Sequence, residues 1–411
     1  MKTLIHNIAV LATPVGQKAA CGTSQGEINI LHDAYILLED DRILEVGEGS
    51  APSVGPEVQR IDACGRLVTP GLVDAHTHLV FGGWREHELA LKRRGVPYLE
   101  ILAQGGGILS TVKMTREATE EELVEKASKV LKEMLALGVT TCEAKSGYGL
   151  DEATELKQLR AIRELGKRQP VELVPTYLGA HAVPKEYKED REAYMELMEA
   201  LLPKIAEEKL AEFCDVFCET GVFTPDESER ILLAAQKHGL RSKIHSDEID
   251  AIGGTNVAGK IRAASAEHLI AITPEGISAL AEGGTVAVLL PATSFYLNKP
   301  YAPARAMIEA GVPVALASDF NPGSCPGFNL QLVMNLGCWK ANMSPEEVLT
   351  AVTLNAAAAC GRAEKLGSVE AGKQADLVIW DAPNLEYIFY RFGENLANTV
   401  IKNGKIQYTK G

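Results

Sequence analysis

The segment Pro70-Gly71-Leu72-Val73-Asp74-Ala75-His76-Thr77-His78 is an apolar run that ends in His-x-His, and the rest of the chain can be interpreted outward from it. Side chains alternate along a strand, so His76 and His78 face the same way. Two imidazoles aimed at one point suit a transition metal. Two hydrogen-bonded strand histidines are the alternative for this pair taken alone, so the other polar residues of the chain must decide.

Seven further strand-like segments follow this one, separated by longer charged segments with helical periodicity. The eight candidate strands are residues 71–80, 139–147, 171–181, 213–220, 241–247, 264–269, 285–293 and 314–319. Such alternation is typical of β/α units around a parallel sheet, and eight strands close a TIM barrel. We therefore predict an α/β fold whose main domain, residues 66–360, is a (β/α)8 TIM barrel.

Both ends of the chain are predicted to be rich in β-strands. Short apolar runs broken by turn residues predict strands at residues 2–11, 26–31, 34–38, 42–46, 372–380 and 399–408. We predict that residues 1–65 and 361–411 pair into one small composite β-sandwich domain built from both termini.

Composition excludes several kinds of partner. The chain has 41 basic and 55 acidic residues, a net charge of −14, which repels nucleic acid and anionic membranes. An anionic substrate would therefore need a local cationic clamp. The eight cysteines are scattered without a C-x-x-C pair, and no apolar run reaches about 18 residues, so we expect reduced thiols and a cytoplasmic protein.

Polar residues gather where the predicted barrel strands end, which is where TIM barrels form their active sites. Five of the nine histidines fall there, together with two carboxylates: His76, His78, His181, His245, His268, Glu248 and Asp319. Nitrogen and oxygen ligands with room for water suit Zn²⁺ or Fe²⁺ rather than calcium. We predict one such divalent ion, with His76, His78, His245 and Asp319 as its ligands.

Hydrolysis is the natural chemistry of such a site, because the ion lowers the pKa of bound water toward about 7. Glu248 lies three residues past His245 and can move protons between that water and a leaving nitrogen. His268 can hydrogen-bond the developing oxyanion or orient the water. A surface carboxylate and a core histidine are the alternatives for these two residues.

These segments resemble the amidohydrolase superfamily, and the resemblance covers essentially the whole chain. Its general part rests on residues 70–78, on Ser318-Asp319 and on residues 367–378. A narrower resemblance, to the imidazolonepropionase family, rests on residues 81–86, 105–108, 143–149, 178–181, 245–248 and 319–324. Several such blocks in the right order are far more specific than His-x-His alone.

The narrower resemblance implies hydrolysis of the cyclic amide bond of 4-imidazolone-5-propanoate to N-formimidoyl-L-glutamate in histidine degradation, by a homodimer. It also implies a set of substrate-binding residues: Arg85, Tyr98, Tyr148, His181, Glu248, Asn321, Gly323 and Ser324. It keeps Glu248, His268 and Asp319 as the catalytic groups. Chemistry agrees at Arg85, since a guanidinium can hold a propionate carboxylate through two parallel hydrogen bonds.

One departure from the superfamily concerns the number of metal ions. Many members carry a lysine at the end of the fourth strand, where its carbamate bridges two metals, but here the sequence is Phe217-Cys218-Glu219-Thr220. We therefore expect one ion, although Glu219 leaves an opening for a second.

Two alternative functions stay open from the sequence. A heteroaromatic aminohydrolase would use the same metal geometry, but its substrates lack the carboxylate that Arg85 would bind. A non-catalytic scaffold would be expected to have lost metal ligands, and none of the four is missing.

Overall fold

In the computed structural model, which describes residues 1–96 and 106–411, an eight-stranded parallel sheet forms the larger part of the molecule. Its strands, in chain order, are β5 (Leu72–Asp74), β6 (Val139–Lys145), β7 (Glu172–Ala180), β8 (Phe213–Cys218), β9 (Arg241–Ser246), β10 (Ser265–His268), β11 (Val286–Leu289) and β12 (Val314–Leu316). Each strand pairs with its neighbours in sequence. The predicted (β/α)8 barrel is therefore confirmed, with shorter strands than the sequence indicated.

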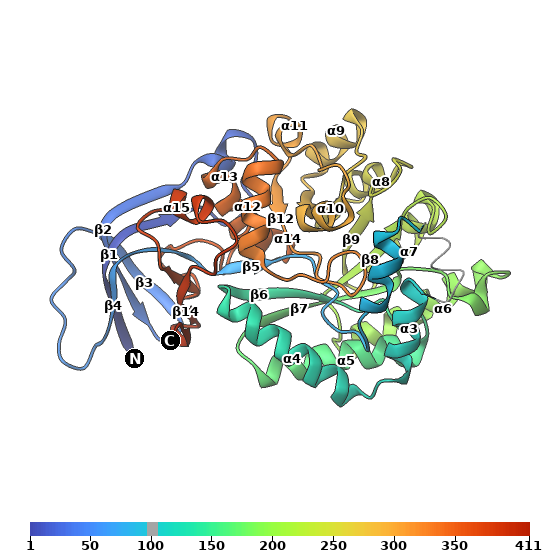
Figure 1. Cartoon of the computed structure of the whole chain (residues 1–411), viewed down its shortest axis with the longest axis horizontal. Coiled ribbons are helices and arrows are strands. Elements are labelled where there is room, and N and C mark those ends of the chain that lie inside the picture. The colour runs from blue at the N-terminus through green and yellow to red at the C-terminus, as the bar shows by residue number, and fades with distance from the viewer. Residues whose placement is uncertain (97–105) are drawn as a thin grey trace.

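Helices follow the strands and pack around this sheet (Figure 1). The longer ones are α3 (Ile108–Glu117), α4 (Glu120–Ala136), α5 (Glu152–Arg168), α6 (Arg191–Glu207), α7 (Pro225–Lys237), α9 (Pro274–Gly283) and α12 (Leu330–Lys340). The shorter ones are α1 (Leu89–Arg93), α8 (Gly254–Lys260), α10 (Pro291–Leu297), α11 (Ala304–Glu309), α13 (Pro345–Ala351), α14 (Leu354–Ala359) and α15 (Leu385–Tyr390). Thr119 with Glu122 and Thr224 with Glu227 form capping boxes that begin α4 and α7. No helix in the described ranges is long and apolar enough to cross a bilayer.

The first and last barrel strands meet along a seam formed by residues 74–78 and 318–320. Thr77 and Phe320 form a parallel bridge. The His78 amide donates to the Phe320 carbonyl at 2.8 Å, and the Asp319 amide donates to the His76 carbonyl at 3.0 Å. The segment that carries His-x-His thus also closes the barrel.

The two ends of the chain combine into one unit, as predicted, and its strands form a second, mixed sheet. Its strand order is β15-β14-β13-β4-β1-β2-β3. The strands are β1 (Lys2–Thr13), β2 (Asn29–Glu39), β3 (Arg42–Glu48), β4 (Gln59–Pro70), β13 (Leu377–Trp380), β14 (Ala397–Lys402) and β15 (Lys405–Thr409). Figure 1 shows the blue N-terminal strands and the red C-terminal segment in this unit, which also carries both termini. One continuous sheet therefore builds the composite domain.

Some boundaries differ from the sequence prediction. The two strands expected at residues 26–31 and 34–38 form one strand, β2. Asp33 lies within β2 with a left-handed φ of 48°, and the strand continues past it. Strand β4 was missed, since Cys64 and Gly65, which have positive φ angles, resemble a turn. The segment expected as a strand to residue 293 ends early, because Pro291 begins α10.

Candidate metal centre

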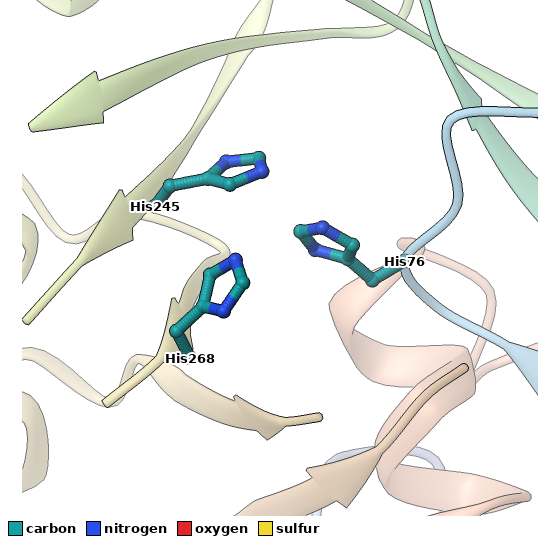
Figure 2. A group of neighbouring side chains, drawn as sticks. All are labelled: His76, His245 and His268. Atoms are coloured by element: carbon teal, nitrogen blue, oxygen red, sulfur yellow. The ribbon is translucent and has the colours of Figure 1, made fainter. Parts of the chain in front are cut away.

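Five side chains from four barrel strands and the segments that follow them lie together at the carboxyl edge of the barrel. His76 and His78 follow β5, His245 lies in β9, His268 ends β10 and Asp319 follows β12. All five are at most 4% exposed. Figure 2 shows the rings of His76, His245 and His268 approaching one another from three different elements.

The four predicted ligands present their donor atoms to one another. His76 Nε2 lies 3.4 Å and His78 Nε2 lies 3.7 Å from Asp319 Oδ1. His245 Nε2 lies 3.4 Å from His78 Nε2. Among the sets of residues whose ligand atoms lie within 4.8 Å of one another, one joins His76 with His78 and Asp319, and another joins His76 with His245 and His268. The structure thus brings together the predicted ligands and places His268 beside them.

Buried histidine nitrogens at this centre have no hydrogen-bond partner among the described residues, as expected of atoms that bind a metal ion. His76 Nε2 is buried and makes no hydrogen bond among the residues that the structure describes, and the same holds for His268 Nδ1. A buried polar atom without a partner is costly. A divalent cation that accepts the lone pair of His76 Nε2 would remove that cost, and imidazole with carboxylate is the donor set that zinc and iron accept.

The pKa shifts of three of the four predicted ligands also favour a cation, whereas Glu267 and Asp319 outweigh burial and Lys145 and raise the pKa of His76 to about 9 in the metal-free protein. Burial, with the neighbouring rings of His181 and His76, holds the pKa of His78 well below its usual value, and burial with His76 does the same to the pKa of His245. Burial would raise the pKa of Asp319, but the His76 ring and His268 outweigh it and lower this pKa to about 2. Neutral imidazoles and an ionised carboxylate are the forms that bind metal.

Backbone strain marks two of these positions. His268 has a φ of 74° and Asp319 a φ of 55°, in the left-handed region that non-glycine residues rarely adopt. Such conformations cost on the order of 1–3 kcal/mol and concentrate at functional sites. The strain turns each side chain at the end of its strand.

The predicted proton shuttle lies at the edge of this group. Glu248 Oε2 is 3.8 Å from His268 Nε2, and the carboxylate is 19% exposed. Burial raises the pKa of Glu248 despite the nearby His268. Glu219, considered for a second metal, instead accepts backbone hydrogen bonds from Thr220, Ile249 and Asp250 at 2.8 to 3.1 Å. Its carboxylate therefore supports the loop after β9.

Three of the predicted substrate contacts adjoin the centre. The His181 ring stacks on His78 with centroids 5.0 Å apart, and Tyr148 lies 5.3 Å from His181. Arg85 Nε donates to the Pro322 carbonyl at 3.5 Å. Gly323 makes room for the guanidinium, because a Cβ at this position would lie 1.0 Å from Arg85 Nη2. Tyr98 lies outside the described residues.

Two further predicted contacts are used to shape the loop after Asp319. The Asn321 side chain donates to the Asp319 carbonyl at 2.7 Å and accepts from the amides of Gly323 and Ser324 at 2.8 and 2.7 Å. Its amide group is therefore occupied by the loop that brings Pro322 and Gly323 to Arg85.

A buried ionic network lies inside the barrel, below the predicted ligands, and was not predicted from the sequence. Its members are fully buried: Glu143, Lys145, Asp215, Lys243 and Glu267. A signal for it exists, because Glu143 and Lys145 on β6 alternate with period two, as do Lys243 and His245 on β9. Charged residues at such inward positions of a barrel strand need partners from neighbouring strands.

The chain is similar to known proteins over nearly its whole length. The amidohydrolase family model matches residues 67–407. An imidazolonepropionase of Alkaliphilus metalliredigens (strain QYMF) is 52% identical over 414 residues, covering 99% of this chain and 98% of that protein. One of Fusobacterium nucleatum subsp. nucleatum is 53% identical over 383 residues, covering 93% of each.

Solved structures share the architecture at much lower identity. A triazine hydrolase variant aligns with a TM-score of 0.76 at 20% identity, over 98% of this chain and 94% of that chain. The guanine deaminase of E. coli aligns with a TM-score of 0.76 at 14% identity, over 100% of both chains. At these identities the likeness shows the fold alone.

Proposed function

Because the chain belongs to the amidohydrolase family, and within it to the imidazolonepropionases, we propose that it opens the ring of 4-imidazolone-5-propanoate by hydrolysis. The reaction cleaves the cyclic amide C–N bond and yields N-formimidoyl-L-glutamate, a step of histidine degradation. The observation that carries the proposal is the convergence of His76, His78, His245 and Asp319 at the barrel mouth.

His76, His78, His245 and Asp319 would hold a divalent ion, which would supply Lewis-acid activation of water and of the ring carbonyl. Glu248 then takes a proton from the attacking water onto its carboxylate and returns it to the departing ring nitrogen. His268, 3.8 Å from Glu248, steadies the oxygen on which charge develops. Water adds across the C–N bond, so the ring carbonyl becomes a carboxylate.

Substrate orientation is assigned to three residues beside the centre. The Arg85 guanidinium binds the propionate carboxylate, which the net charge of −14 would otherwise repel. Tyr148 and His181 contact the ring. Burial lowers the pKa of His181 to about 4, although its hydrogen bond with the Gly147 carbonyl opposes this shift. His181 is therefore neutral at physiological pH, and because its Nδ1 donates to the Gly147 carbonyl, its Nε2 can accept a hydrogen bond.

The bound metal is proposed to be a single Zn²⁺ or Fe²⁺. Three imidazoles and one carboxylate suit either ion, and the engagement of Glu219 by backbone amides argues for one ion. Deamination is not favoured, because the relatives with high identity over the full length are imidazolonepropionases.

The state of the protein in the cell is also proposed. Three large aromatic side chains in one region are exposed, Trp339 by 64%, Tyr390 by 80% and Phe392 by 68%, and they support a homodimer. Eight free cysteines support a location in the reducing cytoplasm.

We further propose that the chain divides into domain segments at residues 1–65, 66–360 and 361–411.

One combined experiment tests the function. Metal content of the purified protein is measured by elemental analysis, and turnover is assayed on imidazolone propionate beside cyclic amides, ureas and aminopurines. We expect one zinc or iron per chain and turnover of imidazolone propionate alone. His245→Ala should lose both metal and turnover while keeping the fold by circular dichroism. Turnover by the metal-stripped variant, or preference for an aminopurine, contradicts the proposal.

A further inference from the structure

The buried network below the metal centre holds charges that the reaction does not use. Lys145 Nζ lies 2.7 Å from Asp215 Oδ2, 2.9 Å from Glu143 Oε2 and 3.2 Å from Glu267 Oε2. Lys243 Nζ lies 2.9 Å from Glu143 Oε1. All five side chains are 0% exposed, so no solvent compensates any of these charges.

The carboxylates that bind Lys145 also contact two of the metal ligands. Glu267 Oε2 lies 3.1 Å from His76 Nδ1. Asp215 Oδ2 lies 3.0 Å from His245 Nδ1. These are the same two oxygen atoms that contact the Lys145 ammonium. Each oxygen therefore lies between one shared cation and the inner nitrogen of a ligand ring.

This arrangement determines which nitrogen each ring offers upward. A carboxylate beside Nδ1 favours the proton on that atom and leaves the lone pair on Nε2. The Nε2 atoms of His76 and His245 are those that lie near Asp319 and His78. The two carboxylates thus orient both rings toward the centre.

We propose that Lys145 is a positioning residue, whose ammonium holds Asp215 and Glu267 in place so that they present His76 and His245 to the metal. The inference rests on the proposed metal-dependent function. Without the ammonium, Glu143 and Glu267 would keep Lys243 as a neighbouring cation, at 2.9 and 3.7 Å, whereas Asp215 would keep no lysine or arginine among the described ion pairs. Like charges at such distances repel one another, so without the ammonium Asp215 or Glu267 would turn away from its histidine.

The test compares Lys145→Met with Lys402→Met. Lys402 is also buried in an ion pair, 2.7 Å from Asp376 Oδ2, but in the composite domain. The same substitution there removes a buried cation far from the ligands and controls for general destabilisation. Zinc affinity of each metal-free protein is measured by competition with a chromogenic chelator, and the visible spectrum of the Co²⁺ form reports ligand geometry.

We expect Lys145→Met to weaken zinc binding by about 10- to 100-fold, the range for loss of a group that orients a metal ligand, and to alter the cobalt spectrum. Lys402→Met should keep both at the wild-type values even if its melting temperature falls. Equal zinc affinity in Lys145→Met and the wild type would overturn the proposal.

A second variant keeps the test decisive if Lys145→Met does not fold. Lys145→Met with Asp215→Asn removes one positive and one negative charge, so the network keeps its net charge, while His245 loses its neighbouring carboxylate. We expect this protein to fold and to bind zinc more weakly than the wild type; wild-type affinity would refute the positioning role. Failure of the wild type itself to bind metal or to turn over substrate would instead refute the proposed function.

Discussion

At the residue scale, Gly323 is the position where the absence of a side chain matters most. Any Cβ there would occupy the place of the Arg85 guanidinium. We expect Gly323→Ala to displace Arg85 and to raise KM for imidazolone propionate roughly ten- to a hundredfold, the loss of a charged hydrogen bond of about 1.5–3 kcal/mol. Steady-state kinetics measure the change.

Gly327→Ala is the matched control, because a Cβ at that position meets no atom within 4 Å. It should keep the wild-type KM. An unchanged KM in Gly323→Ala would mean that Arg85 does not bind the carboxylate.

A second prediction at this scale concerns pH. Burial raises the pKa of Glu248, and a base works only when ionised, so activity should fall as the pH drops through this raised value. We expect the acid limb of kcat/KM above the usual glutamate pKa of about 4.3. Glu248→Gln should lose roughly 10²- to 10⁴-fold in kcat and lose that limb. Asp250→Asn, an exposed acid two residues on, should keep the profile.

Individual site residues were predictable from sequence where a strand period and a strand end coincide. His76, His78 and His245 satisfy both conditions, and the structure brings their nitrogens together. The role of Asn321 was not predictable in the same way, because its side chain hydrogen-bonds its own loop. Such local bonds depend on a loop conformation that period and composition do not encode.

At the scale of elements, helix α5 supports the loop that carries Tyr148. Glu155 is 1% exposed and accepts hydrogen bonds from the amides of Gly147, Gly149 and Leu150 at 3.1, 2.8 and 2.9 Å. We expect Glu155→Gln to lower the free energy of unfolding by about 1–3 kcal/mol, because an amide group replaces a fully used carboxylate. Urea unfolding measures this loss.

The loosened loop should also raise KM, since Tyr148 would be held less firmly. Glu152→Gln, on the exposed first turn of the same helix, should change neither quantity. A Glu155→Gln protein as stable as the wild type would show that the loop holds its shape without this carboxylate.

Element types were predictable and element limits were not. All eight barrel strands lie within the predicted segments, since these alternate with longer charged segments of helical periodicity. The limits failed at β2 and β4, where Asp33 and Cys64 take left-handed backbone angles within a strand. A sequence pattern interprets such residues as turns, because the sheet pairing that keeps them in a strand involves distant segments.

At the scale of the whole molecule, the chain ends are tied to the base of the barrel. Strand β13 pairs antiparallel with β4, which leads directly into β5. Arg362 Nε lies 2.7 Å from Glu172 at the start of β7, and Lys402 on β14 also contacts Glu172 at 3.4 Å. The sequence predicted that both ends form one unit, but the strand order depends on pairings across some 300 residues, which local patterns cannot specify.

The seam between β5 and β12 would give the proposed ion a structural role as well as a chemical one. His76 and His78 stand on one side of that junction and Asp319 on the other. A cation bound by all three side chains would cross-link the first and the last strand of the barrel. Chelation should therefore speed amide deuterium uptake at residues 76–78 and 318–320 more than in β7 or β8, as mass spectrometry of peptic fragments would reveal. Uniform uptake across the barrel would mean that the contact between β5 and β12 does not depend on the ion.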